Sequence, residues 1–399
     1  MERRRTFKYR LYPTGKQSVA LEYQLSEARH LYNAALQERR DAWRMQRVSR
    51  TYYDQANQLK EIRDEGNLGL ANFSASQDVL RRVDKTFKAF FRRVKAGERP
   101  GYPRFKSRDR FDSFSFPAWG NGCRLTDGRL KVQGAGIVKL KMHRTLAGDT
   151  RTLTLKREAG KWYACFSQTV DVPVSEPPHE AIGIDLGISS FSALSNGELI
   201  ANPRSLKSGL ARLRRCQRKV ARRKRGCAGR RKAVRLLRKA HVHIRNQRAD
   251  FQHKLSRRLA DSYGLIAVED LNVKGLARSM LARSVNDAAW GSFLAKLAYK
   301  VEETGGELAK VDPKNTSQAC SECGALPDVP KTLADRVHSC SCGLVIDRDV
   351  NAARNILRRG LRLAGPTWAS RPCVPAEAVC LADGVVTKVV PPRTAQGLG

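Results

Sequence analysis

Three acidic residues at the ends of regular segments constrain this chain more than any other feature of its sequence. Asp185 lies in an apolar run that is followed by a second apolar run and by the turn Ser195-Asn196-Gly197, which predicts a strand and hairpin that open a sheet. Glu269 ends another apolar run, and Asp349 begins a helix-like segment. The three carboxylates can therefore converge at one end of a sheet.

Converging carboxylates suit the hydrolysis of phosphodiester bonds. Two Mg²⁺ ions about 3.5 to 4 Å apart can activate a water and stabilise the leaving oxygen, and Mg²⁺ prefers hard oxygen ligands. Any one such acid is more often a turn or capping residue, so the inference depends on the order of all three. We predict that Asp185, Glu269 and Asp349 are catalytic and bind Mg²⁺ or Mn²⁺, with Asp347 as a nearby alternative to Asp349.

Four cysteines predict a second metal site. Cys320 and Cys323 are separated by two residues, and after sixteen more residues Cys340 and Cys342 are separated by one. Two close thiolate pairs suit a tetrahedral, structural Zn²⁺ site with no open position. The short second spacer leaves His338 as an alternative ligand. The other six of the ten cysteines are scattered, which favours a metal site in a reducing compartment over a disulfide framework.

The charge of the chain indicates a polyanionic partner. The formal net charge is +37, and the 41% of hydrophobic residues is too high for a purely disordered basic tail. Nucleic acid is the expected partner, and an anionic membrane surface is the alternative. There is no apolar run of about 18 residues and no signal-peptide core. We therefore expect a cytoplasmic protein that does not span a membrane.

The basic residues are densest between 204 and 260. An intermittent apolar stripe at helical spacing and a break near Gly226 predict a helical hairpin with one buried face. A charge run is often only a solvated face, but here almost no acid dilutes it, so we expect contacts with phosphates. The residues expected to make them are Arg214, Arg215, Arg218, Arg222, Arg223, Lys224, Arg231 and Arg235.

The first third of the chain predicts a short strand, a helical block and then further strands. Thr14 and Gln17 form a capping-box pattern at the start of one expected helix. Ser74 and Gln77 form a second such pattern, so another helix is expected to begin at Ser74. After residue 99 the pattern changes to alternation, as in Arg129-Leu130-Lys131-Val132, which is typical of strands with one basic, solvated face.

Together these motifs resemble the RuvC and zinc-ribbon motifs of TnpB, a family of transposon-associated, RNA-guided DNA endonucleases related to compact type V CRISPR effectors. The resemblance is carried by Gly183-Ile184-Asp185-Leu186-Gly187, Val268-Glu269-Asp270-Leu271, the segment from Thr316 to Gly324, and Cys342-Gly343 leading to Asp347-Arg348-Asp349-Val350-Asn351-Ala352-Ala353. It is specific from residue 181 onward and weaker before it. It implies a guide RNA, which the composition alone cannot indicate.

The resemblance implies a fold of α/β class joined to a β-barrel, in two lobes, with a nuclease of the ribonuclease H-like type. The implied domains are a wedge-type oligonucleotide-binding barrel (1–12 and 99–178), an inserted helical recognition domain (13–98), a RuvC-like nuclease (181–310 and 347–360) with the basic hairpin, a zinc ribbon (311–346) and a C-terminal tail (361–399). In the family the barrel and helical domain read a short duplex motif beside the target. Tyr53 and Gln77 are our candidates for that role, because Gln can pair with adenine and Tyr can donate to phosphate or base.

The implied function is RNA-guided cleavage of double-stranded and single-stranded target DNA at one two-metal site. Two alternatives stay open: an RNA-guided DNA-binding repressor that does not cut, and a transposase that joins DNA strands with the same acids. The sequence also leaves open whether the guide derives from a transposon end or a CRISPR array, which flanking motif is read, and the oligomeric state.

Overall fold

The computed structural model describes residues 2–172, 176–276, 278, 282–332, 334–365 and 368, in two compact units. The first unit is Met1–Pro173 and the second is Val174–Gly399. Among the described helices, none is both long enough and apolar enough to cross a membrane.

The first unit is built on a nearly closed, antiparallel sheet of seven strands in the order β2-β6-β7-β1-β5-β4-β3. The first strand of the chain is central, because Leu11 pairs with Leu140 of β5 on one side and with Trp162 of β7 on the other. The strands are β1 Glu2–Tyr12, β2 Ser113–Phe116, β3 Cys123–Thr126, β4 Arg129–Val132, β5 Gly136–Lys141, β6 Asp149–Glu158 and β7 Lys161–Asp171.

Three helices lie between β1 and β2 in the sequence: α1 Gly15–Gln46, α2 Tyr52–Asp64 and α3 Phe73–Lys95. The capping box expected at Thr14 and Gln17 is confirmed at the start of α1. The start expected at Ser74 is wrong by two residues, because Asn72 caps α3 by accepting a hydrogen bond from the Ala75 N–H at 2.9 Å. The buried Asn72 amide also donates to Gln133, so tertiary contacts select this cap.

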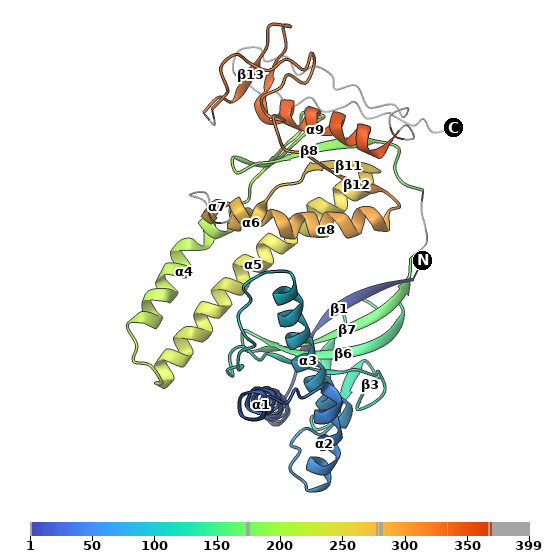
Figure 1. Ribbon diagram of the computed structural model, residues 1–399, viewed down its shortest axis with the longest axis vertical. Coiled ribbons are helices and arrows are strands. Elements are labelled where there is room, and N and C mark those ends of the chain that lie inside the picture. Colours follow the sequence, from blue (N-terminus) through green and yellow to red (C-terminus); the bar gives the residue numbers. More distant parts are fainter. Residues whose placement is uncertain are drawn as a thin grey trace, which may run out of the picture. The chain divides into compact units, whose positions relative to one another are not determined.

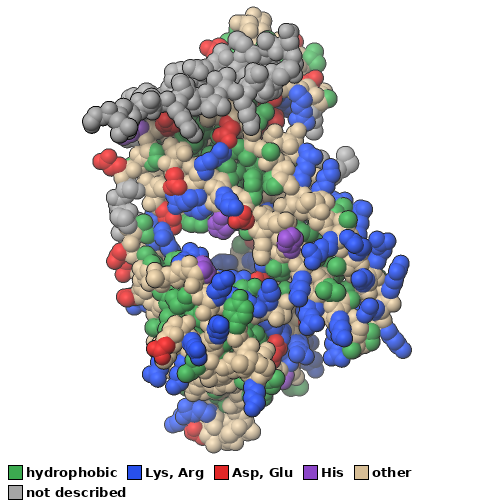
Figure 2. All heavy atoms as spheres, turned by 180° about the vertical axis from the view of Figure 1, so that it is seen from behind, with side chains coloured by type: hydrophobic (Ala, Val, Ile, Leu, Met, Phe, Trp, Pro, Cys, Tyr) green, Lys and Arg blue, Asp and Glu red, His purple; other side chains and the backbone are tan. Residues whose placement is uncertain are grey.

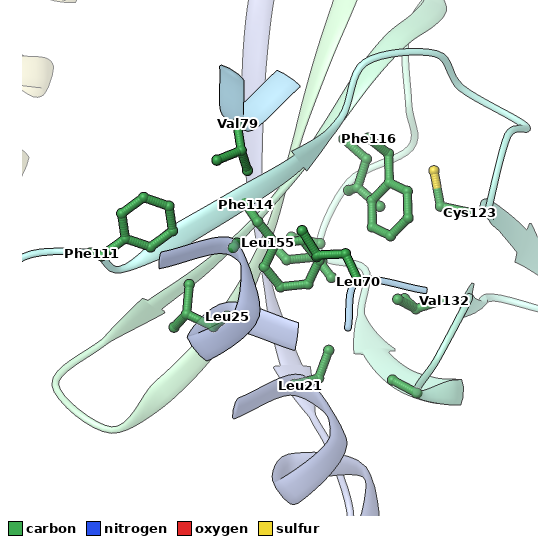
Figure 3. Packing of buried hydrophobic residues seen from close by; sticks show 14 of the residues in the cluster. Leu21, Leu25, Leu70, Val79, Phe111, Phe114, Phe116, Cys123, Val132 and Leu155 are labelled. Carbon is green, nitrogen blue, oxygen red and sulfur yellow. The ribbon is translucent and has the colours of Figure 1, made fainter. Parts of the chain in front are cut away.

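The core of the first unit lies between the helices and the sheet. Leu21 and Leu25 of α1 and Val79 of α3 gather with Phe114 of β2 and Leu155 of β6 (Figure 3). Each of these side chains is at most 3% exposed. Burial of a side chain of this kind contributes about 1.5 to 3 kcal/mol, so α1 and α3 are fixed on the sheet by apolar packing.

The second unit contains a mixed five-stranded sheet in the order β10-β9-β8-β11-β12. β8 runs parallel to β11, and β11 runs parallel to β12, whereas β8, β9 and β10 form an antiparallel meander. This meander is the strand and hairpin expected around Asp185. Its strands are β8 Ala181–Leu186, β9 Ser190–Leu194, β10 Leu199–Ala201, β11 Leu265–Glu269 and β12 Glu307–Val311.

Helices cover both faces of this sheet, with α9 on one side and α8 on the other (Figure 1). Ile184 and Val268 belong to the core that includes α5 and α8, whereas Leu265 and Ala267 belong to the core that includes Ile356 of α9. Successive side chains of a strand point to opposite faces. The helices of this unit are α4 Ser205–Ala221, α5 Ala228–Ser262, α6 Val273–Leu276, α7 Ala282–Ala288, α8 Trp290–Glu303 and α9 Arg348–Ala364.

Two glycines allow α9 to approach the sheet closely. A Cβ atom on Gly183 of β8 would lie 2.1 Å from the carbonyl oxygen of Ala353, and one on Gly360 would lie 2.4 Å from the Cβ of Ala267 in β11. Neither position could carry a side chain without a shift of backbone or strand. The close approach brings the first turn of α9 near the ends of β8 and β11.

Helix α9 extends four residues into the segment expected to be a C-terminal tail, since it ends at Ala364. Trp368 is also buried, in the cluster that α9 forms with the sheet. The remainder of that expected tail, residues 369–399, lies outside the described residues.

The basic segment forms a hairpin of α4 and α5, which extends away from the sheet (Figure 1). Leu213 of α4 packs with Ala240 and Ile244 of α5. The turn comprises residues 222–227, which is earlier in the chain and longer than the break expected at Gly226 to Gly229, because α4 ends at Ala221 and α5 begins at Ala228. The Cys227 sulfur accepts a hydrogen bond from the Arg230 N–H at the start of α5.

Candidate active site

Asp185 and Glu269 lie at the ends of adjacent parallel strands. The pairing of β8 with β11 runs to Ile184 and Val268, and the next residue in each strand is the acid. Because side chains alternate along a strand, both acids share the face covered by α9. Both are partly buried.

Asp349 comes to the same place from the first turn of α9. The Asp347 carboxylate caps the helix by accepting hydrogen bonds from the N–H groups of Asp349 at 2.8 Å and Val350 at 3.2 Å. Asp347 is thus engaged with the backbone. A Cβ atom on Gly187, just after β8, would lie 4.0 Å from Asp349 Oδ2, so the Asp349 carboxylate lies over the end of that strand. This arrangement favours Asp349 over Asp347 as the third acid.

The pKa values of all three carboxyl groups are raised. Burial raises the pKa of Asp185 well above its usual range, and the charges of Glu269 and Asp349 raise it further. Burial also raises the pKa of Glu269, against a hydrogen bond from Thr316, and raises that of Asp349. A bound divalent cation would oppose each of these shifts, because it stabilises the ionised carboxylates.

The carboxylates are near one another but are not gathered as tightly as the cysteines. Among the described residues, the four-cysteine group alone brings three or more His, Cys, Asp or Glu ligand atoms close enough to hold one ion. Ligands of two ions about 3.5 to 4 Å apart need not converge on one point. The spacing of the three acids is therefore compatible with a two-ion arrangement.

The four cysteines form a compact cluster. Their sulfur atoms all lie within 4.8 Å of one another, with Cys320 and Cys342 at 3.7 Å and Cys323 and Cys340 at 3.5 Å. Zinc–sulfur bonds of about 2.3 Å at tetrahedral angles require sulfur atoms about 3.8 Å apart. The cluster therefore has the dimensions of a closed tetrahedral site.

Both cysteine pairs are formed by tight backbone turns. The N–H of Gly324 donates to the Cys320 carbonyl and that of Gly343 to the Cys340 carbonyl, each at 3.0 Å. Both glycines have positive φ, 80° and 90°, which side chains disfavour. The hydrogen bond closes over four residues at the first pair and over three at the second, so the shorter second spacer still yields a tight turn, one residue shorter than the first.

His338, the alternative fourth ligand, is not part of the cluster. It is buried in β13, Val337–Ser339, which pairs with β14, Val345–Asp347, and its Nδ1 contacts Lys331 Nζ. Hydrogen bonds from the Cys342 backbone and from the Cys323 thiol lower the pKa of Cys340 to about 6. Burial and hydrogen bonds with the other three thiols raise the pKa of Cys342 to about 11, so the four thiols interact as one group. His338 contacts Lys331 and not these thiols.

Several residues around the two sites were not expected from the sequence. Thr316 donates a hydrogen bond from its hydroxyl to Glu269 Oε1, and Asn351 and Asn355 of α9 bind the backbone beside Cys320. Arg348 donates to the backbone of the segment before β13. Asn, Thr and Arg residues near a metal-binding motif in the sequence indicate that hydrogen bonds support the site. The residue types alone do not identify the partners of those hydrogen bonds.

All eight basic residues named in the hairpin are exposed. None of the eight pairs with a carboxylate of the described residues, in contrast to Arg257 and Arg258 nearer the sheet, which pair with Glu303 and Glu198. Figure 2 shows Lys and Arg side chains crowded over the hairpin, with few acids among them. These eight residues therefore present positive charge that no carboxylate of the described residues neutralises, whereas Arg248 and Lys254 farther along α5 pair with Asp287 and Asp250.

In the first unit, Tyr53 and Gln77 lie on neighbouring helices, α2 and α3. Tyr53 is 74% exposed, and Gln77 is partly exposed. The unit also has an unexpected groove of about 670 Å³. Its lining residues are Leu36, Arg40, Trp43, Arg44, Arg47, Tyr102, Pro103, Arg104 and Phe105, with no carboxylate among them. The available sequence signals for it were the arginines around Trp43 at the end of α1 and the alternation of aromatic and basic residues after α3.

Three family models match the chain. They are a "Probable transposase" family at residues 155–280, a "Cas12f1-like, TNB domain" at 290–356 and a "Helix-turn-helix domain" at 1–47. The first includes Asp185 and Glu269, and the second includes the cysteine cluster and Asp349.

Relatives match over most of the chain. A "Putative RNA-guided DNA endonuclease" of Streptomyces pristinaespiralis is 35% identical over 372 residues, 90% of each chain. A protein of Escherichia coli K12 with the same description, InsQ, is 28% identical over 90% of this chain and 93% of its own. The "CRISPR-associated endodeoxyribonuclease Cas12f1" of Sulfoacidibacillus thermotolerans is 30% identical over 56% of this chain and 57% of its own.

The fold has a counterpart among solved structures. The chain aligns with Cas12f1 in a structure of the "Cas12f1-sgRNA-target DNA complex" with a TM-score of 0.58 and 15% identity, over 89% of this chain and 98% of Cas12f1. At that identity the likeness shows the fold alone. The identity and coverage of the Streptomyces relative establish the family: the chain belongs to the TnpB family of RNA-guided DNA endonucleases.

Proposed function

We propose that this protein cuts guide-matched DNA with Asp185, Glu269 and Asp349 as the ligands of two Mg²⁺ or Mn²⁺ ions in one RuvC-like site. The observation that supports the proposal is the convergence of the three acids from adjacent parallel strands and the facing helix. The charges of Glu269 and Asp349 add to the effect of burial in raising the pKa of Asp185. Such a charge cluster is unfavourable by itself and is favourable around cations.

The protein's part in the reaction is to hold the acids ionised and in place. The ions, when bound, would activate a water and stabilise the leaving oxygen of the phosphodiester. The strand ends fix Asp185 and Glu269, and the Asp347 cap fixes the first turn of α9 and so orients Asp349. Burial beneath α9 limits the water around the carboxylates and strengthens every charge interaction there.

We propose that Cys320, Cys323, Cys340 and Cys342 hold a structural Zn²⁺ ion. Their spacing matches a closed four-thiolate site, which leaves no position for substrate. Binding of zinc to such a site contributes to folding free energy. The ion would therefore stabilise the segment between β12 and α9 and would take no part in cleavage.

We propose that the eight exposed basic residues of the hairpin bind the phosphates of guide RNA and of target DNA. Base pairing with the guide would specify the target, as in RNA-guided effectors generally. The first unit would act as the wedge barrel and recognition helices, with Tyr53 and Gln77 reading the flanking duplex motif. The Tyr53 ring is exposed and α2 lies beside α3, so a duplex could reach both residues.

The proposal is tested with protein purified together with the RNA that it retains. Sequencing that RNA defines the guide, and a plasmid with the matching sequence should be cut when Mg²⁺ is present. Binding without cutting by the unmodified protein would indicate the repressor alternative, and joined strands would indicate the transposase. Absence of retained RNA from a folded preparation made with the native flanking DNA would count against guided cleavage.

A further inference from the structure

One short segment, residues 316–321, contacts the elements that carry both the second and the third acid. Thr316 is 3% exposed, and its hydroxyl donates to Glu269 Oε1. The Pro313 carbonyl, at 3.0 Å, is the other acceptor within reach of the hydroxyl. Hydrogen bonds to an ionised acceptor are stronger than those to a neutral one, so the Glu269 carboxylate is the preferred partner.

The same segment is bound to α9, the helix that begins with the third acid. The Asn355 amide donates to the carbonyls of Thr316 at 2.9 Å and Ala319 at 2.7 Å. The Asn351 amide donates to Ala319 at 2.8 Å and accepts from the Ser321 N–H at 2.8 Å. Both asparagines are at most 6% exposed. Buried amides with satisfied partners hold backbone in one arrangement.

The cysteine cluster fixes the segment from its other end. Cys320 lies within residues 316–321, is fully buried, and belongs to the four-cysteine group. The segment is therefore held by a metal-type cluster, by two buried asparagines and by the hydrogen bond to Glu269. Among the described residues, Thr316 makes the one hydrogen bond to the Glu269 side chain.

We propose that Thr316 is a positioning residue for the metal site: its hydroxyl orients Glu269, and residues 316–321 keep that orientation in register with Asp349 through α9. This inference rests on the proposed function, since it assigns Thr316 a role around the carboxylates named there. Residues that orient metal ligands typically change metal affinity or activity 10- to 100-fold when they are replaced. Loss of the Thr316 hydroxyl should therefore weaken binding of the catalytic ions while the zinc cluster stays loaded.

The test measures Mn²⁺ binding by electron paramagnetic resonance in the full-length protein with its retained RNA. RNA also binds Mn²⁺, so the signal of the site is the difference between each protein and the same protein carrying Asp185→Ala. Thr316→Val keeps the shape of the side chain and removes the hydroxyl, Thr316→Ala removes the side chain, and Thr316→Ser retains the hydroxyl. We expect Kd for Mn²⁺ to rise about 10- to 100-fold in the Val and Ala variants and to stay near the wild-type value in the Ser variant.

The same proteins are assayed for zinc content, melting temperature and the Mn²⁺ concentration that gives half-maximal cleavage. Asn355→Ala, which releases the Thr316 carbonyl, should raise that concentration in the same direction as Thr316→Val. Wild-type Mn²⁺ affinity in folded, zinc-loaded Val and Ala variants would overturn the inference. So would a Ser variant as weak as the Val variant, or unfolding of both the Val and Ala variants, since Thr316 would then act through packing.

The two proposals fail in different ways. If Asp185→Ala neither removes a Mn²⁺ signal nor stops cleavage, the proposed active site is wrong. If Asp185→Ala is inactive and the Val and Ala variants of Thr316 match the wild type in both measurements, the active site stands and the role of Thr316 is wrong.

Discussion

The cysteine cluster and the carboxylate group are both sets of ligand side chains in the second unit, and the structure gathers them to different degrees. The cysteines lie within 4.8 Å of one another. Each cysteine pair is formed by one local turn, so the backbone alone places two ligands. The acids come from two strands and a helix that are far apart in the sequence, and they repel one another.

This difference separates a site formed by local folding from a site formed by tertiary packing. In a closed thiolate site the four thiolates occupy every coordination position of the metal ion, and binding of the ion favours the folded state. The acids depend on the close packing of α9 at Gly183 and Gly360 to face one another. The cysteine cluster should therefore respond to mutation mainly through stability, and the carboxylate group mainly through catalysis.

The largest effect expected on either side of this comparison is from Asp185→Ala. Loss of this carboxylate should lower the cleavage rate about a thousandfold or more, equivalent to roughly 4 kcal/mol of transition-state stabilisation. Guided binding should change little, because the basic hairpin and the guide are untouched. Rates are measured with a labelled target duplex, and binding is measured by gel shift in Ca²⁺.

Glu269→Ala and Asp349→Ala should behave like Asp185→Ala, and double variants should be little worse than single ones because the three acids act as a unit. Normal cleavage by all three single variants would remove the carboxylate group from the mechanism. Chelation of Mg²⁺ at concentrations that leave zinc bound should also stop cleavage.

Cys320→Ser should show the opposite pattern. Loss of one thiolate should release zinc and destabilise the segment that ends at α9, by roughly 3 kcal/mol or more. Zinc content by elemental analysis and thermal unfolding measure the two effects. Cys227→Ser is the matched control, because its thiol caps α5 and a serine hydroxyl can take over that role. Full zinc content in the Cys320 variant would contradict the four-cysteine assignment.

Part of this comparison could be predicted from the sequence, because the signals are local. The paired cysteines, the capping box at Thr14 and the strands that end near Asp185 and Glu269 all depend on residues close in the chain. The pairing of β8 with β11, which brings the two acids side by side, does not. The asparagine cap of α3 was missed, since Asn72 is selected by Gln133, a residue distant in the sequence.

The contacts around Thr316 could not be predicted for the same reason. Its partners, Glu269 and Asn355, are 47 and 39 residues away, and polar residues that satisfy one another in a core have no periodic signature. Trp368 likewise carried no repeat that would place it beside α9. The candidate metal ligands could be identified from the sequence. The residues that hold those ligands in place could be identified only from the folded structure.

A smaller effect separates the hairpin from both ligand groups. Arg218→Gln with Arg222→Gln should weaken RNA binding and lower the slope of log affinity against log salt by about 1.5, since each lost phosphate contact removes about 0.7 to 0.9. Stability and zinc content should not change, because both side chains are exposed and unpaired with carboxylates of the described residues. Arg257→Gln with Arg258→Gln is the matched control, since both residues pair with acids. Equal slopes for the two double variants would contradict a specific role for the hairpin.

The smallest expected effect distinguishes the two acids at the start of α9. Asp347→Ala removes the cap that accepts from Asp349 and Val350, and should lower stability by about 1 kcal/mol. Asp347→Asn keeps an oxygen that can cap the helix, so its stability and cleavage should stay close to those of the wild type. Asp349→Asn retains the shape of the side chain but removes its charge, and should nearly abolish cleavage with little loss of stability. If Asp347→Asn were inactive and Asp349→Asn active, the third ligand would be Asp347, and the first turn of α9 would have to be held by groups other than this cap.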